Sequence, residues 1–555
     1  MATTVVSSPV SGAARGHSTH DSLSHDRSYA VLLVTGLTCL AVLVHGYHPF
    51  AEDGGLYLAG VKRLLDPRLY PHQTAFVEEH LRFSIFAPFV AALVRCSRLS
   101  VEMVTFLLYV AATWTTLFAT WKLAARCYDE CAARTGAVAL LAVWLTLPIA
   151  GTSLMLMDPY VTARSISTPC TLVALAGILD IEESGWRMRL LMPARSLIAV
   201  ACALLIGMLF HPLMTAYTAT CALVLAAMLR YRLAWPRTFG IVCLAAVGAA
   251  AILQLLSVPE GAAYTRVAVT RAYWFLSQWR WYEWFGLAAP IMLLLGMCIC
   301  WRNDRPKRVA LAQMAVTIGV AATLVALLFA RIHNRAHLLA RLQPLRIFQT
   351  VYLVMILFLG AELGRRLLRQ SAARWILTFA ALASVMLIAE RSVYPGSAHI
   401  EWPGHTMRST DINPWVRAFL WIRDNTALDS LVALDADYIE KPDEDAQCFR
   451  AIAERSALPD YSKDGGEASI TPSLIQDWTQ GERAQEELSA ETDEKRISAL
   501  KPFGVDWVVL EKNAVTNFSC DYANEAVKVC RIPAAERTWL SSKQPSLLLP
   551  PQARR

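Results

Sequence analysis

Charged residues are scarce in this chain. Asp, Glu, Lys and Arg together make up 17% of its 555 residues, and hydrophobic residues make up 55%, whereas an ordinary soluble domain carries about 25% charged residues. This shortage excludes a typical soluble protein. The formal net charge of +7 does not call for nucleic acid either, because short basic loops are what membrane topology requires. The composition predicts a protein that crosses the bilayer many times and has no nucleic-acid partner.

Paired cysteine motifs are also missing. No Cys-x-x-Cys pair occurs, and most of the thirteen cysteines stand singly in apolar runs, where a thiol behaves as a small hydrophobic group. In the polar C-terminal part, Cys520 and Cys530 are expected to form a structural disulfide in an oxidising compartment. No small-residue cleavage site follows the first apolar run, so that run is interpreted as a retained anchor. Residues 1–28, rich in Ser, Thr, His and Gly, are expected to be disordered and cytoplasmic.

Long apolar runs account for most of the chain up to residue 394. Eleven of them approach the roughly 20 residues that cross a bilayer: 29–46, 101–121, 136–156, 165–180, 196–210, 212–229, 237–258, 285–301, 309–329, 345–363 and 375–391. The shorter run 83–94, which contains Pro88, is expected to be a partial or interfacial segment. The stretch 196–229 allows either one long span or two short ones. The predicted fold is therefore a polytopic α-helical membrane protein with about 11 to 12 spans.

Basic clusters set the expected orientation. Five of them fall at alternating ends of the runs: Lys122/Arg126/Arg134, Arg187/Arg189/Arg195, Arg230/Arg232/Arg237, Arg302/Arg305/Lys307/Arg308 and Arg365/Arg366/Arg369/Arg374. If all five are cytoplasmic, the N-terminus lies inside and the polar tail outside. The loops 47–80, 157–164, around 211, 259–284 and 330–344 then face outward together. The expected location is a bacterial inner membrane.

The composition changes abruptly near residue 395. Residues 395–555 are rich in Asp, Glu, Lys, Ser and Pro and are long enough for one extracytoplasmic domain. Stretch 413–426 has helical apolar spacing, while 430–438, 505–512 and 525–532 are expected to be strands. We therefore expect an α/β domain after a membrane domain of residues 29–394, with 47–80 as its first outer loop.

Two acids stand where the first span ends, in "GYHPFAEDGGLYLAG" (46–60). Ionisable groups at membrane depth cost on the order of 2.5 to 3.5 kcal/mol each and usually serve a ligand, an ion or a pathway. Glu52 and Asp53, with Asp158 of the second outer loop, are the candidate catalytic acids. Asp53 can act as a general base, or Asp53 and Asp158 can hold a divalent cation such as Mg²⁺ or Mn²⁺. Candidate groups for a lipid phosphate are Arg164, His211, Arg271, Arg335, His337, Arg341 and Arg346.

Each candidate also has a structural interpretation. Asp53 is able to cap a following helix, and Asp158 before Pro159 is able to start a turn. His211 before Pro212 fits a structural residue at a helix break. The arginines of 330–346 fit side chains that extend along the membrane surface. The sequence leaves both interpretations open for each of these residues.

In the order of these features the chain resembles the GT-C superfamily of polytopic glycosyltransferases, which includes the protein O-mannosyltransferases and the aminoarabinose transferases. The resemblance rests on one span, an outer loop that opens with Glu52-Asp53, the segment "LYLAGVKRLLDPRLYP" (56–71), the acid Asp158, and a soluble domain after the last span. It implies a sugar donor carried on polyprenyl phosphate or diphosphate, and an inverting transfer outside the membrane with Asp53 as base. The WWD-type motif of oligosaccharyltransferase tails is missing from the sequence, which argues against peptide N-glycosylation.

Three functional hypotheses follow. The leading one is a glycosyltransferase that uses a polyprenyl-phosphate-linked sugar at the outer face of the bilayer. The second is a transporter or flippase of lipid-linked or polysaccharide intermediates, although no pair of matching interrupted spans suggests an inverted repeat. The third is a membrane-anchored scaffold whose tail binds a partner.

Overall fold

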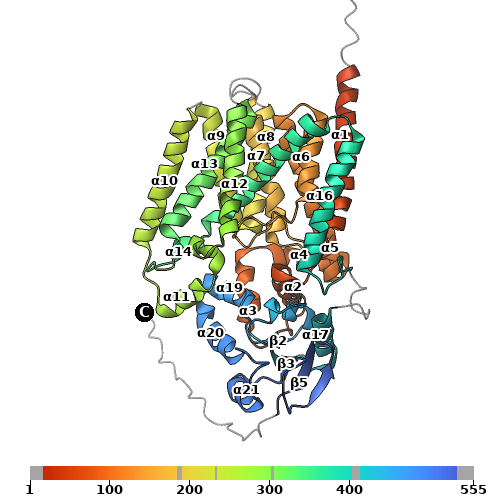
Figure 1. The fold of residues 1–555 in the computed structure, drawn as a ribbon, viewed down its shortest axis with the longest axis vertical. Coiled ribbons are helices and arrows are strands. Elements are labelled where there is room, and N and C mark those ends of the chain that lie inside the picture. The colour runs from red at the N-terminus through yellow and green to blue at the C-terminus, as the bar shows by residue number, and fades with distance from the viewer. Residues whose placement is uncertain (1–16, 184–190, 232–233, 302–305, 403–412, 534–555) are drawn as a thin grey trace, which may run out of the picture.

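A helical bundle stands on a smaller C-terminal part that contains a sheet (Figure 1). The computed structural model describes residues 17–183, 191–231, 234–301, 306–402 and 413–533. The chain enters the bundle at the end far from the sheet and, after α16, continues into the sheet-containing part. The order of elements is therefore the predicted one, with a polytopic helical domain followed by an α/β domain.

Within the described residues, nine helical segments are long and apolar enough to cross a membrane. They are α1 (His17–His45), α5 (Val101–Cys127), α7 (Ala163–Glu183), α9 (Pro212–Tyr231), α10 (Trp235–Leu256), α12 (Trp281–Cys300), α13 (Pro306–Phe329), α16 (Ala372–Val393), and the composite Leu338–Leu368 made of α14 (Leu338–Arg341), η4 (Pro344–Ile347), α15 (Phe348–Glu362) and η5 (Leu363–Leu368). The prediction of a polytopic membrane protein is confirmed.

Three shorter apolar helices account for the remaining runs: α4 (Phe86–Ser97), α6 (Cys131–Val143) and α8 (Leu191–Phe210). At 12 residues, α4 is about 18 Å long, too short for a core of about 30 Å. The prediction of a span over 136–156 is wrong, because the helix ends at Val143 and irregular backbone follows. Pro148 and Gly151 lie in that irregular segment and favour turns. The stretch 196–229 forms two helices, which separate at His211.

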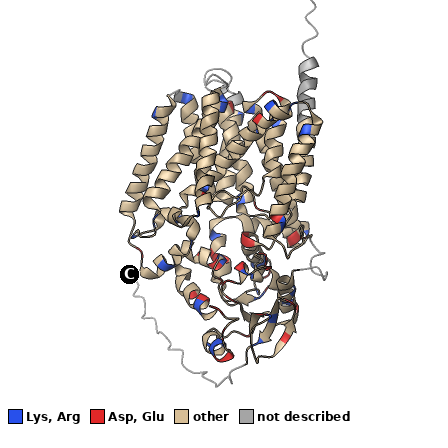
Figure 2. Cartoon of the chain, viewed as in Figure 1, with Lys and Arg blue, Asp and Glu red and all other residues tan. Residues whose placement is uncertain are grey.

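The ends of the bundle differ in charge. Figure 2 shows lysines and arginines gathered at the end far from the C-terminal part. At the other end, the loops meet the C-terminal part directly: Lys62 Nζ donates to Ala451 O at 2.9 Å, and Arg271 donates to Tyr461 O at 2.8 Å. Loop 157–164 joins them, since His48 N donates to Pro159 O at 2.8 Å. The chain thus brings residues from several of the loops predicted to share one side of the membrane to one end of the bundle.

A five-stranded mixed sheet forms the centre of the C-terminal part, in the order β2-β1-β3-β5-β4. The strands are β1 (Leu431–Ala433), β2 (Ser456–Ala457), β3 (Trp507–Glu511), β4 (Cys520–Ala523) and β5 (Val527–Arg531). The helices around them are α17 (Pro414–Asn425), α18 (Phe449–Ala453), α19 (Lys463–Ile470), α20 (Ile475–Ala484) and α21 (Asp493–Leu500). Each of the three predicted strands occurs, and Cys520 and Cys530 form the expected disulfide across β4 and β5.

The loop 47–80, which follows α1, folds together with the C-terminal part. It contains α2 (Glu52–Leu65), α3 (Ala75–Glu78) and η1 (Glu79–Phe83). Phe50 and Leu58 are buried in one hydrophobic cluster with Phe419 and Val432 of the C-terminal part, and burial of such side chains is worth about 1.5–3 kcal/mol each. The loop that carries the acidic pair is therefore fixed from both sides, by the bundle and by the C-terminal part.

Candidate active site between the bundle and the C-terminal domain

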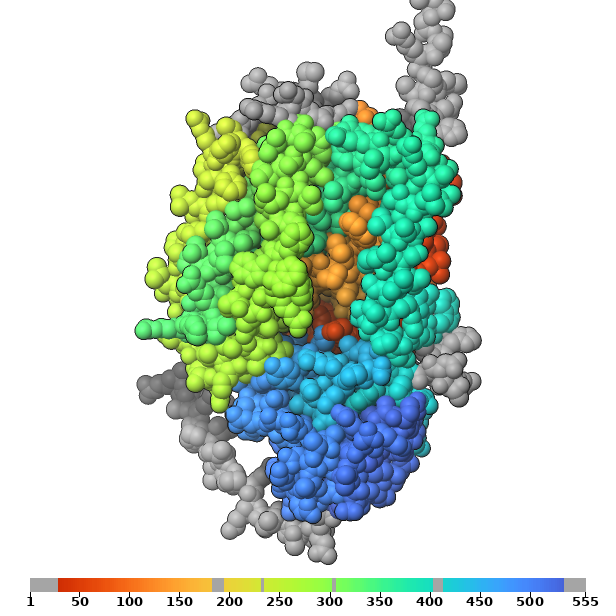
Figure 3. Space-filling model, in the orientation of Figure 1, coloured from red at the N-terminus to blue at the C-terminus, as the bar shows by residue number. Residues whose placement is uncertain are grey.

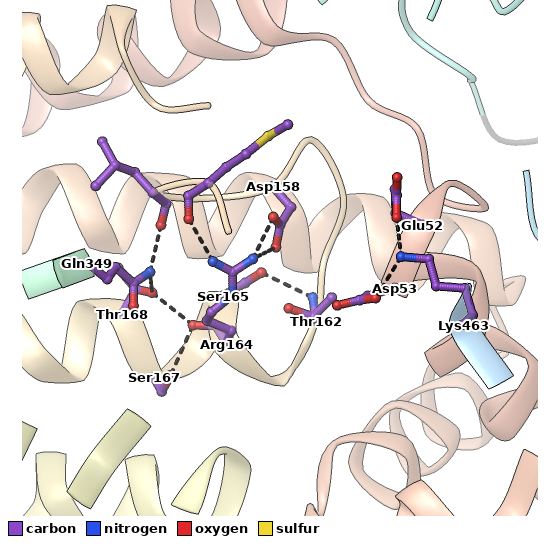
Figure 4. Close-up of polar contacts among 12 residues, drawn as sticks. Glu52, Asp53, Asp158, Thr162, Arg164, Ser165, Ser167, Thr168, Gln349 and Lys463 are labelled. Carbon is purple, nitrogen blue, oxygen red and sulfur yellow. Dashed lines mark hydrogen bonds and ion pairs between the residues drawn. The ribbon is translucent and has the colours of Figure 1, made fainter. Parts of the chain in front are cut away.

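The candidate site lies where the bundle meets the C-terminal part. We call it the interface site, and it consists of Glu52, Asp53, Asp158, Arg164, Arg346 and Lys463. Figure 3 shows a hollow at this level, between α12 and α16 and above the blue C-terminal domain, with segments coloured red and orange at its back. Figure 4 shows two charged groups of the site, one around Lys463 and one around Arg164.

Glu52 and Asp53 open α2 without capping it. The N-cap position is Ala51, and no side-chain hydrogen bond caps the helix, so Asp53 is not the capping residue that one interpretation allowed. Both acids lie in the first turn, where the helix dipole favours negative charge. Glu52 has a positive φ of 51°, and its N–H donates to Ala446 O at 2.8 Å. The contact with segment 446 of the C-terminal domain holds the start of α2 in place.

Lys463, from the start of α19, bridges this pair and offsets one of its two negative charges. Its Nζ contacts the Glu52 carboxylate and lies 3.2 Å from Asp53 Oδ1. The two carboxylates keep 41% and 50% of their side-chain surface exposed, against 16% for Lys463. The Lys463 ammonium lowers the pKa of Asp53, with Arg164 and Arg346 acting in the same direction and burial opposing them. Asp53 is therefore an ionised, accessible carboxylate at neutral pH.

Asp158 is paired with Arg164 at the start of α7. Arg164 donates to Asp158 Oδ1 and to Met155 O, each at 2.6 Å, and the Arg164 and Asp158 side chains are 8% and 6% exposed. Burial raises the pKa of Asp158 and outweighs the opposing effect of Arg164. The negative charges of Asp53 and Glu52 also raise this pKa, which shows that the two charged groups share one electrostatic environment.

Arg346 brings an unpaired cation to the same place. It lies on η4 and lines a cavity with Tyr273 and Gln343. Its Nε is buried without a hydrogen-bond partner, and no carboxylate pairs with its guanidinium in the part of the chain that the structure describes. The charge of Arg346 lowers the pKa of both Asp53 and His211. The side chain as a whole is only half-buried, and a guanidinium without a carboxylate partner is able to bind a phosphate, so this position is suited to an anionic ligand.

His211 lies between α8 and α9, beside the interface site. Its Nδ1 accepts a hydrogen bond from Met214 N at 3.4 Å, which matches the structural role expected at a helix break. Burial lowers its pKa to about 3, and the charges of Arg346 and Arg164 add to that shift. His211 is thus neutral near neutral pH, so a contact of its ring with a phosphate would be a hydrogen bond without a full charge, and its predicted phosphate-binding role stays a prediction.

Besides His211, four more of the predicted phosphate-binding residues lie outside the interface site. Arg271 donates to the carbonyls of Tyr461 and Ser462, at 2.8 and 2.6 Å, and so holds the turn that leads into Lys463. His337 Nδ1 is hydrogen-bonded to the Glu260 carboxylate at 2.9 Å. The other two are Arg335, which is exposed, and Arg341, whose guanidinium stacks 5.7 Å from the Tyr264 ring centre.

Sequence reasoning missed the contribution of α19. Lys463 and Glu467 both face the acidic pair from this helix, and His80 of η1 lies nearby, since Asp53 shifts the pKa values of Glu467 and His80. The sequence holds one signal for α19: "KDGG" at 463–466 repeats the pattern of "EDGG" at 52–55, a charged pair followed by two glycines. Each of the two segments starts a helix.

The donor set fits a divalent cation poorly. Both oxygens of Asp158 bind Arg164, and Asp53 already contacts Lys463. The described residues also contain no group of three or more His, Cys, Asp or Glu side chains placed to hold a metal. Hard cations need several oxygen ligands, so the predicted Asp53–Asp158 metal site is not supported by these contacts, and the chemistry below is derived from the protein side chains.

Gly55, in the glycine pair that follows the acids, lies at a position with no room for a side chain. A Cβ at this position would collide with Cys448 Cβ and the Phe50 carbonyl, and neither can move away easily. Gly55→Ala is expected to destabilise the protein by about 1–3 kcal/mol and to displace α2. Thermal unfolding checks this, with Gly466→Ala as the matched control because a Cβ there meets nothing within 4 Å. Equal melting temperatures for the two variants would contradict the close packing of α2.

The fold and the site define a polytopic helical membrane protein with an α/β domain and a charged site between them. Among solved structures, the chain is similar to the crystal structure of the Archaeoglobus fulgidus oligosaccharyltransferase in complex with zinc and sulfate, with a TM-score of 0.44, 12% identity, and coverage of 86% of this chain and 68% of that one. No family model and no curated protein matches. At that degree of similarity, function has to be argued from the side chains of the site.

Proposed function

We propose that the protein is a glycosyltransferase that moves a sugar from a polyprenyl-phosphate-linked donor to an acceptor hydroxyl. The observation that carries this proposal is the unpaired Arg346 guanidinium beside the accessible Asp53 carboxylate. A guanidinium binds phosphate bidentately, and a carboxylate accepts a proton. The surrounding spans supply an apolar environment for the lipid chain of the donor.

The reaction has a simple balance. The acceptor oxygen attacks C1 of the sugar, and the bond between C1 and the phosphate oxygen breaks. The phosphate leaves with the electron pair, and the positive charges of Arg346 and Arg164 stabilise the charge that develops on it. The acceptor proton passes to Asp53, which Lys463 keeps ionised before the reaction. Attack from the face opposite the leaving group inverts the configuration at C1.

Thermal unfolding with lipid ligands tests the phosphate site. Polyprenyl phosphate added to the purified protein is expected to raise the melting temperature by several degrees, because a ligand that binds only the folded state stabilises it. The corresponding polyprenol has the same chain without the phosphate and is expected to have little effect. Equal shifts with the two lipids would contradict a phosphate site at Arg346.

We further propose that the interface site faces the extracytoplasmic side of a bacterial inner membrane. The gathering of basic residues at the far end of the bundle supports this orientation. Cys131 is exposed next to that basic end, and Cys96 is exposed near the end of α4. In intact cells, single-cysteine variants are expected to react with a membrane-impermeant maleimide at Cys96 and not at Cys131. Labelling at Cys131 and not at Cys96 would contradict the proposed orientation of the protein in the membrane.

A further inference from the structure

We propose that α2, η1 and α19 form an acceptor subsite that binds an uncharged, polyhydroxylated molecule such as a neutral sugar, through Tyr57, His80 and Glu467. This inference rests on the proposed function, because it assigns the acceptor to one side of Asp53. These three polar side chains have no hydrogen-bond partner in the described part of the chain.

His80 is the most unusual of the three. It is 7% exposed, and both of its ring nitrogens are buried without a partner. Its ring stands edge-on to Tyr57 at 5.5 Å, and a Cβ at Gly60 would lie 3.2 Å from Nε2. A buried polar group without a partner is unfavourable, and a ligand hydroxyl at this position would give the His80 ring the hydrogen bond that it lacks.

Glu467 lies one helical turn after Lys463 on α19, so both side chains point to the same side of the helix. Its carboxyl is partly exposed and takes part in no hydrogen bond or ion pair among the described residues. Burial raises its pKa to about 8, and the carboxylates of Asp464, Asp53 and Glu79 contribute to the shift. At neutral pH Glu467 is therefore mostly protonated and able to donate a hydrogen bond.

Tyr57 connects this subsite to Asp53. It lies on α2, one turn after Asp53. Burial raises the pKa of its phenol, and the charges of Asp53 and Glu467 add to the shift. Burial likewise lowers the pKa of His80 to about 4. The three side chains are thus neutral at neutral pH, and each offers a donor, an acceptor or both.

The charge distribution selects the kind of acceptor. On one side of Asp53, Arg346 and Arg164 favour an anion, which is the place of the donor phosphate. On the other side, the carboxylates of Glu79, Asp464 and Asp53 lie around Glu467. They are already paired with Arg82, Arg450 and Lys463, so these pairs offer no free positive charge to an anion. A bound cation would favour the ionised form of Glu467, and the ionised carboxylate cannot donate a hydrogen bond. Neutral hydroxyl groups suit the three neutral side chains, so the acceptor class is a sugar or polyol without charge.

Binding of small sugars tests the subsite without any transfer reaction. The probes are methyl glycosides of glucose, galactose, mannose and N-acetylglucosamine, compared with glucuronic acid and glucosamine, and the readout is saturation-transfer NMR on the purified full-length protein with polyprenyl phosphate present. At least one neutral glycoside is expected to bind at least about tenfold more tightly than both charged sugars. Binding by none of the neutral glycosides, or equal binding of a charged sugar, would overturn the proposal while leaving the proposed function standing.

Two variants separate a binding role from a structural one. His80→Phe keeps the ring contact with Tyr57 and removes both nitrogens, so it is expected to weaken glycoside binding at least about fivefold without lowering the melting temperature. Glu467→Gln is expected to bind the glycoside above pH 8, whereas the wild type loses binding there because Glu467 ionises. Glu486→Gln, at an exposed position of the same domain, is the control. Unchanged binding in His80→Phe, or a parallel pH profile in Glu467→Gln, would overturn the proposal.

Discussion

Asp53→Asn is expected to lower the rate of sugar transfer at least about 100-fold, because a positioned base typically contributes 10²–10⁴. The substitution keeps the size of the side chain and removes the charge that accepts the proton. Glu52 still pairs with Lys463 in this variant, so the fold and the stabilisation by polyprenyl phosphate are expected to remain. The measurement is the single-turnover rate with a saturating lipid-linked sugar.

Asp66→Asn is the matched control for this prediction. Asp66 follows the same helix, α2, and its exposed carboxylate pairs with Arg68, so its loss should leave transfer unchanged. Lys463→Met gives an independent check, because the Lys463 ammonium is the main reason for the lowered pKa of Asp53. Without it the pKa rises, Asp53 stays protonated to higher pH, and the acidic limb of the pH–rate profile moves upward. A wild-type rate in Asp53→Asn would remove Asp53 from the reaction.

Arg346→Met is the second large expected effect. The variant removes an unpaired guanidinium and leaves a side chain of similar length, so the melting temperature of the free protein is expected to stay the same or to rise. The stabilisation by polyprenyl phosphate is expected to disappear, and kcat/KM for the donor to fall at least about 100-fold, because charge-assisted hydrogen bonds to phosphate are among the strong ones. Thermal unfolding and steady-state kinetics measure the two effects.

Arg341→Met is the control for Arg346. Arg341 lies on α14, in the same composite segment, but its guanidinium stacks on Tyr264. It is expected to retain the response to polyprenyl phosphate. If polyprenyl phosphate stabilised Arg346→Met and Arg341→Met equally, the phosphate site would lie elsewhere in the bundle.

Local patterns in the sequence predicted most helices and strands well. They predicted poorly which residues from different helices and loops meet in the interface site. The apolar runs and the strand at 505–512 depend on nearby residues, so they could be read from composition and spacing. The exception was the run 136–156, where irregular backbone is buried inside the bundle next to α7 and keeps the apolar composition of a span. Hydrophobicity alone does not distinguish that case from a continuous helix.

The site was predictable only in part, because its members come from distant positions. Asp53, Asp158 and Arg346 were identified by their type and by the side of the membrane expected for their loops. Lys463 lies more than 400 residues after Asp53, in a domain expected to fold apart from the first loop, so no local pattern linked the two. Arg271 and His337 were predicted to bind phosphate because of their residue type, but they lie outside the interface site. Both side chains already have hydrogen-bond partners within the protein, the Tyr461 carbonyl and Glu260.

Product analysis tests the central claim most directly. The purified protein in proteoliposomes is given a polyprenyl-phosphate-linked sugar and a neutral glycoside acceptor, and both lipid and sugar products are identified by mass spectrometry and NMR. We predict free polyprenyl phosphate and a new glycosidic bond in equal amounts, with inverted configuration at C1, and neither product with Asp53→Asn. Donor lipid that stays intact and only moves between the two leaflets would contradict the account and identify a flippase.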